Sequence, residues 1–95
     1  MKQVTEQIKR AFENKKSLKV NNTRTDGTSV FLHGNEIIKR DKSGIVLFTF
    51  SGWPSVTTRE RLRGILDLDV CQRKGEQYYN GAKVFDLNAW HVVQR

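Results

Sequence analysis

The sequence predicts an α+β fold: an N-terminal helix, an antiparallel β-meander of four strands, a second helix and C-terminal β-hairpin strands. Three observations predict it. Apolar residues recur at helical spacing over residues 2–14 and again over 58–67. Between these segments the apolar period is two, with turn residues at regular intervals. A strong hairpin signal follows the second helical segment. We expect the helices to cover one face of the sheet.

The first helix is predicted from a single apolar face. Val4, Ile8, Ala11 and Phe12 stand at positions i, i+4, i+7 and i+8, which lie on the same side of an α-helix. The polar residues 14–16 end this pattern. A short amphipathic helix is therefore expected at the start of the chain.

A meander is predicted next, because short apolar segments alternate with turns. Its four strands are expected at residues 17–25, 28–32, 36–40 and 45–50. Asp26 and Gly27 have the sequence of a type I′ hairpin turn, in which both central residues take positive φ. The last strand contains no charged residue, so we expect it to be central in the sheet and buried on both faces.

The second helix is predicted after Pro54, which cannot donate a ladder hydrogen bond and so ends the preceding strand. Thr57 and Glu60 have the spacing of a capping box. The helix is expected over residues 58–67, with three apolar residues toward the core: Leu62, Ile65 and Leu66. Three arginines flank that apolar stripe, with Arg59 and Arg63 on one edge and Arg61 on the other.

The C-terminal part is predicted to form further strands at residues 70–73, 77–79 and 82–85. Asn80-Gly81 joins the last two as a hairpin turn. Alternation requires one of Tyr78 and Tyr79 to face inward. The tail, residues 86–95, contains Trp90, Val92 and Val93 and should dock on the body, either as a strand or as irregular chain.

Length and composition favour one domain, residues 1–95, with a net charge of +7 and a pI near 9.9. A basic domain is attracted to polyanions such as nucleic acid, although basic residues can also serve only solubility. No apolar run approaches the ~20 residues that cross a bilayer. The N-terminal sequence shows no apolar signal segment, and the single cysteine, Cys71, fits a reducing cytoplasm.

Three motifs follow one another along most of the chain. They are Leu32-His33-Gly34-Asn35-Glu36-Ile37-Ile38, then Gly52-Trp53-Pro54-Ser55-Val56-Thr57-Thr58-Arg59-Glu60-Arg61-Leu62, and then Gln72-Arg73-Lys74-Gly75-Glu76-Gln77-Tyr78-Tyr79. In this order they resemble a family of small bacteriophage domains with the pattern HGN-x-I, a strand, GW-x-T-x-TT-x-x-RLN and Q-K-x-G-x-W/Y-Y. Ser55 replaces the threonine and Arg63 the asparagine of that pattern. The resemblance implies a phage protein acting in the host cytoplasm, and it implies no chemistry.

No catalytic residue, metal site or cofactor is predicted. His33 and His91 are far apart in sequence, and neither stands at a metal-ligand spacing from Cys71. His33 fits a turn residue and Cys71 a small buried apolar residue. No carboxylate pair or phosphate-binding glycine loop stands out. We therefore expect a protein that is not an enzyme.

The sequence favours nucleic-acid binding by a phage regulatory protein, with RNA slightly ahead of DNA. The candidate residues are basic or aromatic: Arg59, Arg61, Arg63, Trp53, Lys39, Arg40, Lys42, Arg73, Lys74 and Tyr78. The arginines stand at a helix start, where free amides and the helix dipole favour phosphate. Trp53 and Tyr78 could stack on unpaired bases, although Trp53 fits a core anchor over the helix better.

The competing hypothesis is a protein-directed inhibitor of a host enzyme, a toxin–antitoxin pair or a defence complex. Tryptophan, tyrosine and arginine are also the residues enriched at protein-binding hot spots. The sheet edges could in addition pair with a second copy and form a homodimer.

Overall fold

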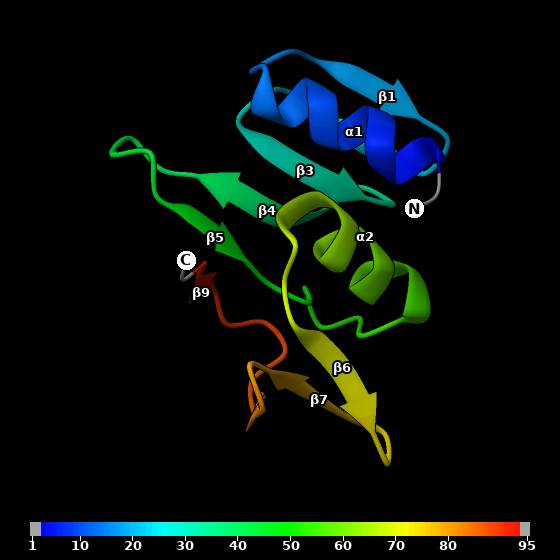
Figure 1. Cartoon of the computed structure of the whole chain (residues 1–95), viewed down its shortest axis with the longest axis vertical. Helices are drawn as coiled ribbons and strands as arrows, with labels where there is room; N and C mark the ends of the chain where they lie inside the picture. The colour runs from blue at the N-terminus through cyan, green and yellow to red at the C-terminus, as the bar shows by residue number, and fades with distance from the viewer. Residues whose placement is uncertain (1–2, 94–95) are drawn as a thin grey trace.

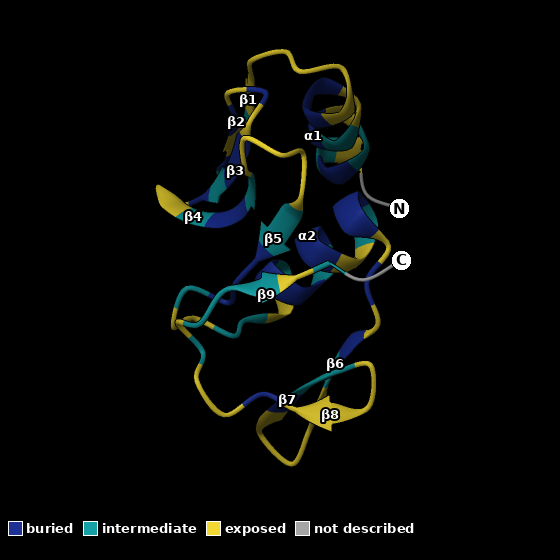
Figure 2. Ribbon diagram, turned by 90° about the vertical axis from the view of Figure 1, so that its left-hand side faces the viewer, coloured by how far each residue is buried: buried dark blue, intermediate teal, exposed yellow. Residues whose placement is uncertain are grey.

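In the computed structural model, which describes residues 3–93, two helices pack on the same side of a six-stranded antiparallel sheet (Figures 1 and 2). The helices are α1 (Gln3–Glu13) and α2 (Val56–Leu66). The sheet has the order β1 (Leu18–Val20), β2 (Thr23–Thr25), β3 (Ser29–Leu32), β4 (Asn35–Arg40), β5 (Val46–Phe48) and β9 (His91–Val92). A smaller antiparallel sheet contains β6 (Val70–Arg73), β7 (Glu76–Tyr79) and β8 (Ala82–Lys83). The predicted α+β fold is confirmed.

The hydrophobic core lies between the helices and the facing side of the large sheet (Figure 2). From α1 it receives Ile8 and Phe12, as the helical spacing predicts. All three apolar residues predicted for α2 are also buried in it. Tyr79 is the inward-facing tyrosine of β7, and its ring meets that of Phe48 edge-on with centroids 4.8 Å apart.

The meander has one more strand than predicted. The run expected at residues 17–25 is split into β1 and β2 by a turn that begins at Asn21, whose φ is +53°. Asparagine adopts this left-handed conformation more easily than most residues, so it can reverse the chain without glycine. The prediction of one long strand was wrong because an asparagine pair was counted as strand.

The turn after β2 also differs from the prediction. Gly27 has a φ of +91°, but Asp26 does not have a positive φ, so the turn is not type I′. Instead, the carboxylate of Asp26 accepts hydrogen bonds from the backbone amides of Thr28 and Ser29, at 2.9 and 2.8 Å. These bonds hold the pKa of Asp26 below its ordinary value, the bond from Ser29 contributing most. The predicted I′ geometry does occur at Asn80-Gly81, where both φ values are positive.

Strand β5 is shorter than predicted, and it is an inner strand because the tail adds β9 beside it. Leu47 pairs with Val92 and Phe48 with His91. The predicted docking of the tail is confirmed for the described residues, and here it takes the form of a strand. Burial on both faces is not observed, since Leu47 is only half-buried. The predicted strand therefore has one core face and one open face.

The start of α2 corrects the predicted capping box. Ser55 is the N-cap, and its hydroxyl accepts a hydrogen bond from the Thr58 amide at 3.1 Å. The helix consequently begins at Val56, two residues earlier than predicted. The carboxylate of Glu60 accepts hydrogen bonds from the hydroxyl of Thr5 instead of from the helix start. Serine at position 55 thus has a defined role in starting the helix.

Arg61 joins both helices to the sheet from a buried position, with 5% of its surface exposed. Its guanidinium donates to the hydroxyls of Thr23 in β2, at 2.9 Å, and Thr5 in α1, at 2.8 Å. It also donates to the amide oxygen of Asn22 and forms an ion pair with Glu60. A guanidinium with this many partners can be buried because its donors are satisfied.

Arg59 joins α2 to the smaller sheet in the same way and is 8% exposed. It donates to the carbonyl of Pro54 at 2.8 Å and to the side-chain oxygens of Gln72 and Gln77 at 2.9 and 3.0 Å. Burial lowers the pKa of Arg59, and the positive charge of Arg63 lowers it further.

Replacing Arg61 should destabilise the protein strongly. Arg61→Ala leaves the half-buried carboxylate of Glu60 and the two buried hydroxyls of Thr5 and Thr23 without their donor, so we expect a loss of about 3 kcal/mol in the free energy of unfolding. Arg10→Ala is the control. It removes the same charge from an exposed ion pair with Glu6 and should cost about 0.5 kcal/mol or less. Urea denaturation of both variants measures the difference, and equal losses would contradict the structural role of Arg61.

Candidate nucleic-acid interface

The side of the large sheet that faces away from α1 and α2 presents a row of cationic and aromatic side chains. Lys19 in β1 pairs with Arg24 in β2, and Arg24 pairs with Phe31 in β3. The residues that alternate with them, such as Thr23 and Leu32, are buried on the helix side. Alternation along each strand therefore places the first three side chains on the opposite face.

The row continues across the other half of the sheet. Lys39 in β4 pairs with Leu47 in β5, which pairs with Val92 in β9. Trp90 precedes β9, and the Lys39 ammonium lies 4.0 Å from the centre of its ring. We call this surface the uncovered face, and it consists of Lys19, Arg24, Phe31, Glu36, Lys39, Leu47, Trp90 and Val92. Of the described helices and strands, none packs on it (Figure 2).

Two cation–aromatic pairs stand on the uncovered face. The guanidinium carbon of Arg24 lies 4.1 Å from the centre of the Phe31 ring, and Lys39 covers Trp90 as described. Such pairs are attracted by the electron-rich face of the ring. Glu36 lies between them, opposite Phe31, and accepts a hydrogen bond from the Ser29 hydroxyl at 2.5 Å. The face is thus positive at both ends with one carboxylate in the middle.

Of the basic residues predicted from the sequence to contact nucleic acid, Lys39 lies on the uncovered face, and Lys42 is exposed in the turn between β4 and β5. Arg40 points to the helix side, where it donates to the carbonyls of Gly27 and Phe12.

Arg63 is exposed on α2 but donates to the carbonyl of Val70 at 3.0 Å. Arg59 and Arg61 are engaged internally, so the structure does not assemble the three arginines into one exposed cluster.

The predicted residues at the C-terminal side form a separate group on the smaller sheet. Arg73 and Tyr78 are on neighbouring strands, with the guanidinium carbon 5.8 Å from the ring centre. Lys74 is exposed in the β6–β7 turn with a φ of +50°. Cys71, expected to be buried, is half-buried. This group lies at the far end of the molecule from β1 and α1 (Figure 1).

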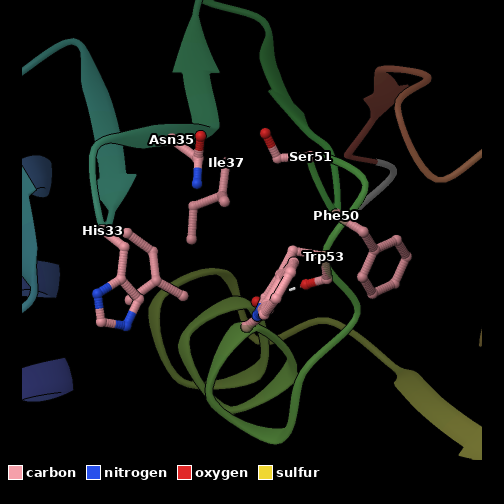
Figure 3. A pocket seen from close by; sticks show the side chains of 8 residues that line it. His33, Asn35, Ile37, Phe50, Ser51 and Trp53 are labelled. Carbon is pink, nitrogen blue, oxygen red and sulfur yellow. Dashed lines mark hydrogen bonds between the residues drawn. The ribbon is translucent and has the colours of Figure 1, made fainter.

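Trp53 is not the core anchor that the sequence favoured, because 67% of its surface is exposed. Its ring forms one wall of a pocket of about 270 Å³ (Figure 3). The pocket is lined by Leu32, His33, Asn35, Ile37, Phe50, Ser51, Trp53 and Thr58. His33 has a φ of +52° and is the turn residue that the sequence predicts. The first two sequence motifs are thus brought together in this pocket.

Residues 3–93 contain no group of three or more histidine, cysteine, aspartate or glutamate side chains placed to hold a metal ion. Within the same range, no helix is long and apolar enough to cross a membrane.

Comparison with known protein families matches residues 1–92 to the family described as Kyanoviridae Gp96 protein. The chain belongs to this family. Kyanoviridae Gp96 is a phage protein family, so the resemblance to bacteriophage domains is confirmed. Comparison of this Gp96-family protein with curated proteins and with solved structures gave no match.

Several residues of the uncovered face could not be selected from the sequence of this Gp96-family protein. Arg24 and Phe31 are adjacent only because β2 and β3 pair in a particular register, and the sequence analysis placed Arg24 inside a longer strand. Trp90 reaches Lys39 because the tail returns to β5. The sequence did contain one signal for Arg24. It stands between Thr23 and Thr25, so alternation places its side chain on the face of the sheet opposite to that of the buried threonines.

Removing the Trp53 ring should leave the fold almost unchanged. Trp53→Ala deletes an exposed side chain, so the free energy of unfolding should fall by less than about 1 kcal/mol. Phe50→Ala is the matched control, because this neighbouring ring is fully buried and its loss should cost about 3–5 kcal/mol. Thermal and urea unfolding compare the two. If Trp53→Ala lowers the free energy of unfolding as much as Phe50→Ala does, the Trp53 ring is packed in the core.

Proposed function

We propose that this Gp96-family protein binds single-stranded nucleic acid, RNA ahead of DNA, on its uncovered face and without catalysing a reaction. The observation that carries the proposal is the pair of cation–aromatic contacts, Arg24 with Phe31 and Lys39 with Trp90. They supply, side by side, the two kinds of group that single strands require: positive charge for phosphates and aromatic surfaces for bases.

The chemistry of these contacts favours an unpaired strand over a duplex. A base can stack on an aromatic ring or on the plane of an arginine guanidinium, and each such contact is worth about 1–3 kcal/mol. A flat sheet surface suits bases that are splayed out of a helix, which is more common in RNA. The protein's net charge of +7 adds a general attraction to phosphates. We place this binding in the host cytoplasm, where a phage-encoded protein meets host and phage RNA.

A protein-directed inhibitor of a host factor is the second candidate. It is favoured by exposed apolar side chains away from the uncovered face, chiefly Phe85, which is 83% exposed, and Val56. Large exposed aromatic residues are typical of protein-binding hot spots. A pull-down from host lysate treated with nuclease separates the two functions, since a stable protein partner would survive that treatment and an RNA-bridged partner would not.

The affinity for single-stranded RNA should fall steeply as the salt concentration rises. Removing the positive charges of Arg24 and Lys39 should make this fall less steep. In the Arg24→Gln/Lys39→Gln double variant, two phosphate contacts are lost, so the slope of log K against log salt should become less negative by roughly 1.4. Fluorescence anisotropy with labelled RNA and DNA of the same length, from low to physiological salt, measures it.

The control for this experiment is Lys9→Gln/Arg10→Gln on α1, which removes the same charge from the helix side of the sheet. It should weaken binding much less than the double variant of the uncovered face. Absence of binding at low salt would refute the proposal. Equal losses in both double variants would show that net charge, and not the uncovered face, determines the affinity.

A further inference from the structure

We infer that the pocket between His33 and Trp53 receives one unpaired nucleobase of the bound strand. The inference rests on the proposed function and adds to it a defined base-binding site, which lies across the β3–β4 turn from the uncovered face.

The backbone on both sides of Trp53 is fixed while its ring remains exposed. The Trp53 amide donates to the carbonyl of Phe50, and the Trp53 carbonyl accepts from the amide of Ser55 and the hydroxyl of Thr58, all at 2.9 Å. The preceding residue, Gly52, donates to the carbonyl of Leu87 at 2.9 Å. A side chain at Gly52 would meet the Asn88 side chain at 2.9 Å, and its φ of +71° also favours glycine. The fold therefore fixes the backbone of Trp53, so binding at its ring requires no ordering of that backbone.

The pocket combines an apolar floor with a polar rim. Leu32, Ile37 and Phe50 form the floor and are each at most 3% exposed. Ile37 points into the space between the rings of His33 and Trp53 (Figure 3). A β-bulge places it there, because the β3–β4 register shifts between Val30 and Phe31. A planar group can enter between the two rings and rest on an apolar surface.

The rim supplies hydrogen-bonding groups suited to the edge of a base. The side-chain amide of Asn35 has two donors and one acceptor. Among the described residues, none forms a hydrogen bond with it. Ser51 and His33 each add a group that can donate or accept. The eight lining residues include no carboxylate, so the pocket does not repel a phosphate-bearing ligand. Its volume of about 270 Å³ lies near the lower limit of small-molecule sites, about 300 Å³, which suits one ring system.

The pocket adjoins the positive end of the uncovered face through His33. This residue also lines a neighbouring hollow that contains Lys19, Arg24 and Phe31. A strand whose phosphates lie along these cations can therefore cross the β3–β4 turn and place its next base against Trp53. This charge continuity favours a nucleobase over the apolar side chain of a protein partner, which would need no cations beside the pocket.

The two tryptophan indoles allow the pocket and the uncovered face to be observed separately by NMR. Trp53 reports on the pocket and Trp90 on the uncovered face, and Trp53→Phe assigns the two signals. The probes are the four ribonucleoside 5′-monophosphates, ribose 5-phosphate, a single-stranded RNA of mixed sequence and the same strand without bases. We expect the Trp53 signal to move with the monophosphates and with RNA, and not with ribose 5-phosphate or the abasic strand.

Affinity measurements complete the test. Trp53→Ala should weaken RNA binding roughly 5- to 150-fold, the range that one lost base stack implies. Phe85→Ala, which removes an exposed ring elsewhere, should not weaken it. Asn35→Ala should make the four monophosphates bind more equally, because it removes the amide that can distinguish their edges.

The outcomes separate this inference from the proposed function. In one outcome, RNA moves the Trp90 signal but not the Trp53 signal, and Trp53→Ala binds RNA as tightly as the unchanged protein. The base pocket is then refuted and RNA binding stands. If monophosphates move Trp53 but no strand binds, the pocket takes a free nucleotide and the proposed function is refuted. If no probe moves either signal, both are refuted, and a protein partner accounts better for the exposed Trp53.

Discussion

The hydrogen bonds of the buried Arg61 guanidinium join three elements of the fold, α1, β2 and α2, at one point beside the hydrophobic core. Thr5 of α1, Thr23 of β2 and Glu60 of α2 all bind to the guanidinium. Both helices are thereby fixed on the same side of the sheet, which leaves the other side uncovered (Figure 2). Burying a guanidinium is costly, and it is tolerated here because its donors are paired. The existence of the uncovered face depends on this arrangement.

Arg59 extends the same principle to the smaller sheet. Its bonds to Gln72 and Gln77 connect α2 with β6 and β7. Two of the three arginines on α2 are therefore structural, and the positive charge on which the proposed binding depends is located elsewhere. It stands on strands β1, β2 and β4, next to aromatic rings. Helix α2, which the sequence favoured as the binding element, instead supports the large sheet, and we propose that this sheet binds the partner.

The elements of the fold could be predicted from local patterns, whereas the roles of their polar residues could not. The α1 face of Ile8 and Phe12, the Asn80-Gly81 turn and the inward side of α2 follow from periodicity and turn chemistry alone. The burial of Arg61 depends on hydroxyl groups that lie up to 56 residues away in sequence, which no local pattern reveals. A long arginine at the edge of an apolar stripe can extend to solvent or inward, and its distant partners decide which.

The candidate site was predicted only in part for the same reason. Lys39 and Trp53 were selected as basic and aromatic residues, but the environment of Trp53 was misjudged, because an apolar ring beside a buried strand normally joins the core. Instead, the backbone of Trp53 is bonded within the turn at Gly52, and 67% of the residue's surface is exposed. Phe31 and Trp90 became candidates only when strand pairing placed them beside cations.

Photo-crosslinking to single-stranded RNA that contains 4-thiouridine, followed by mass spectrometry of the peptides, tests the central claim most directly. The account predicts crosslinks in peptides that contain Phe31, Trp53 or Trp90, and none on the outer side of α1. Crosslinks confined to α1 or to the β6–β7 turn around Lys74 would contradict it, because the strand would then lie away from the uncovered face.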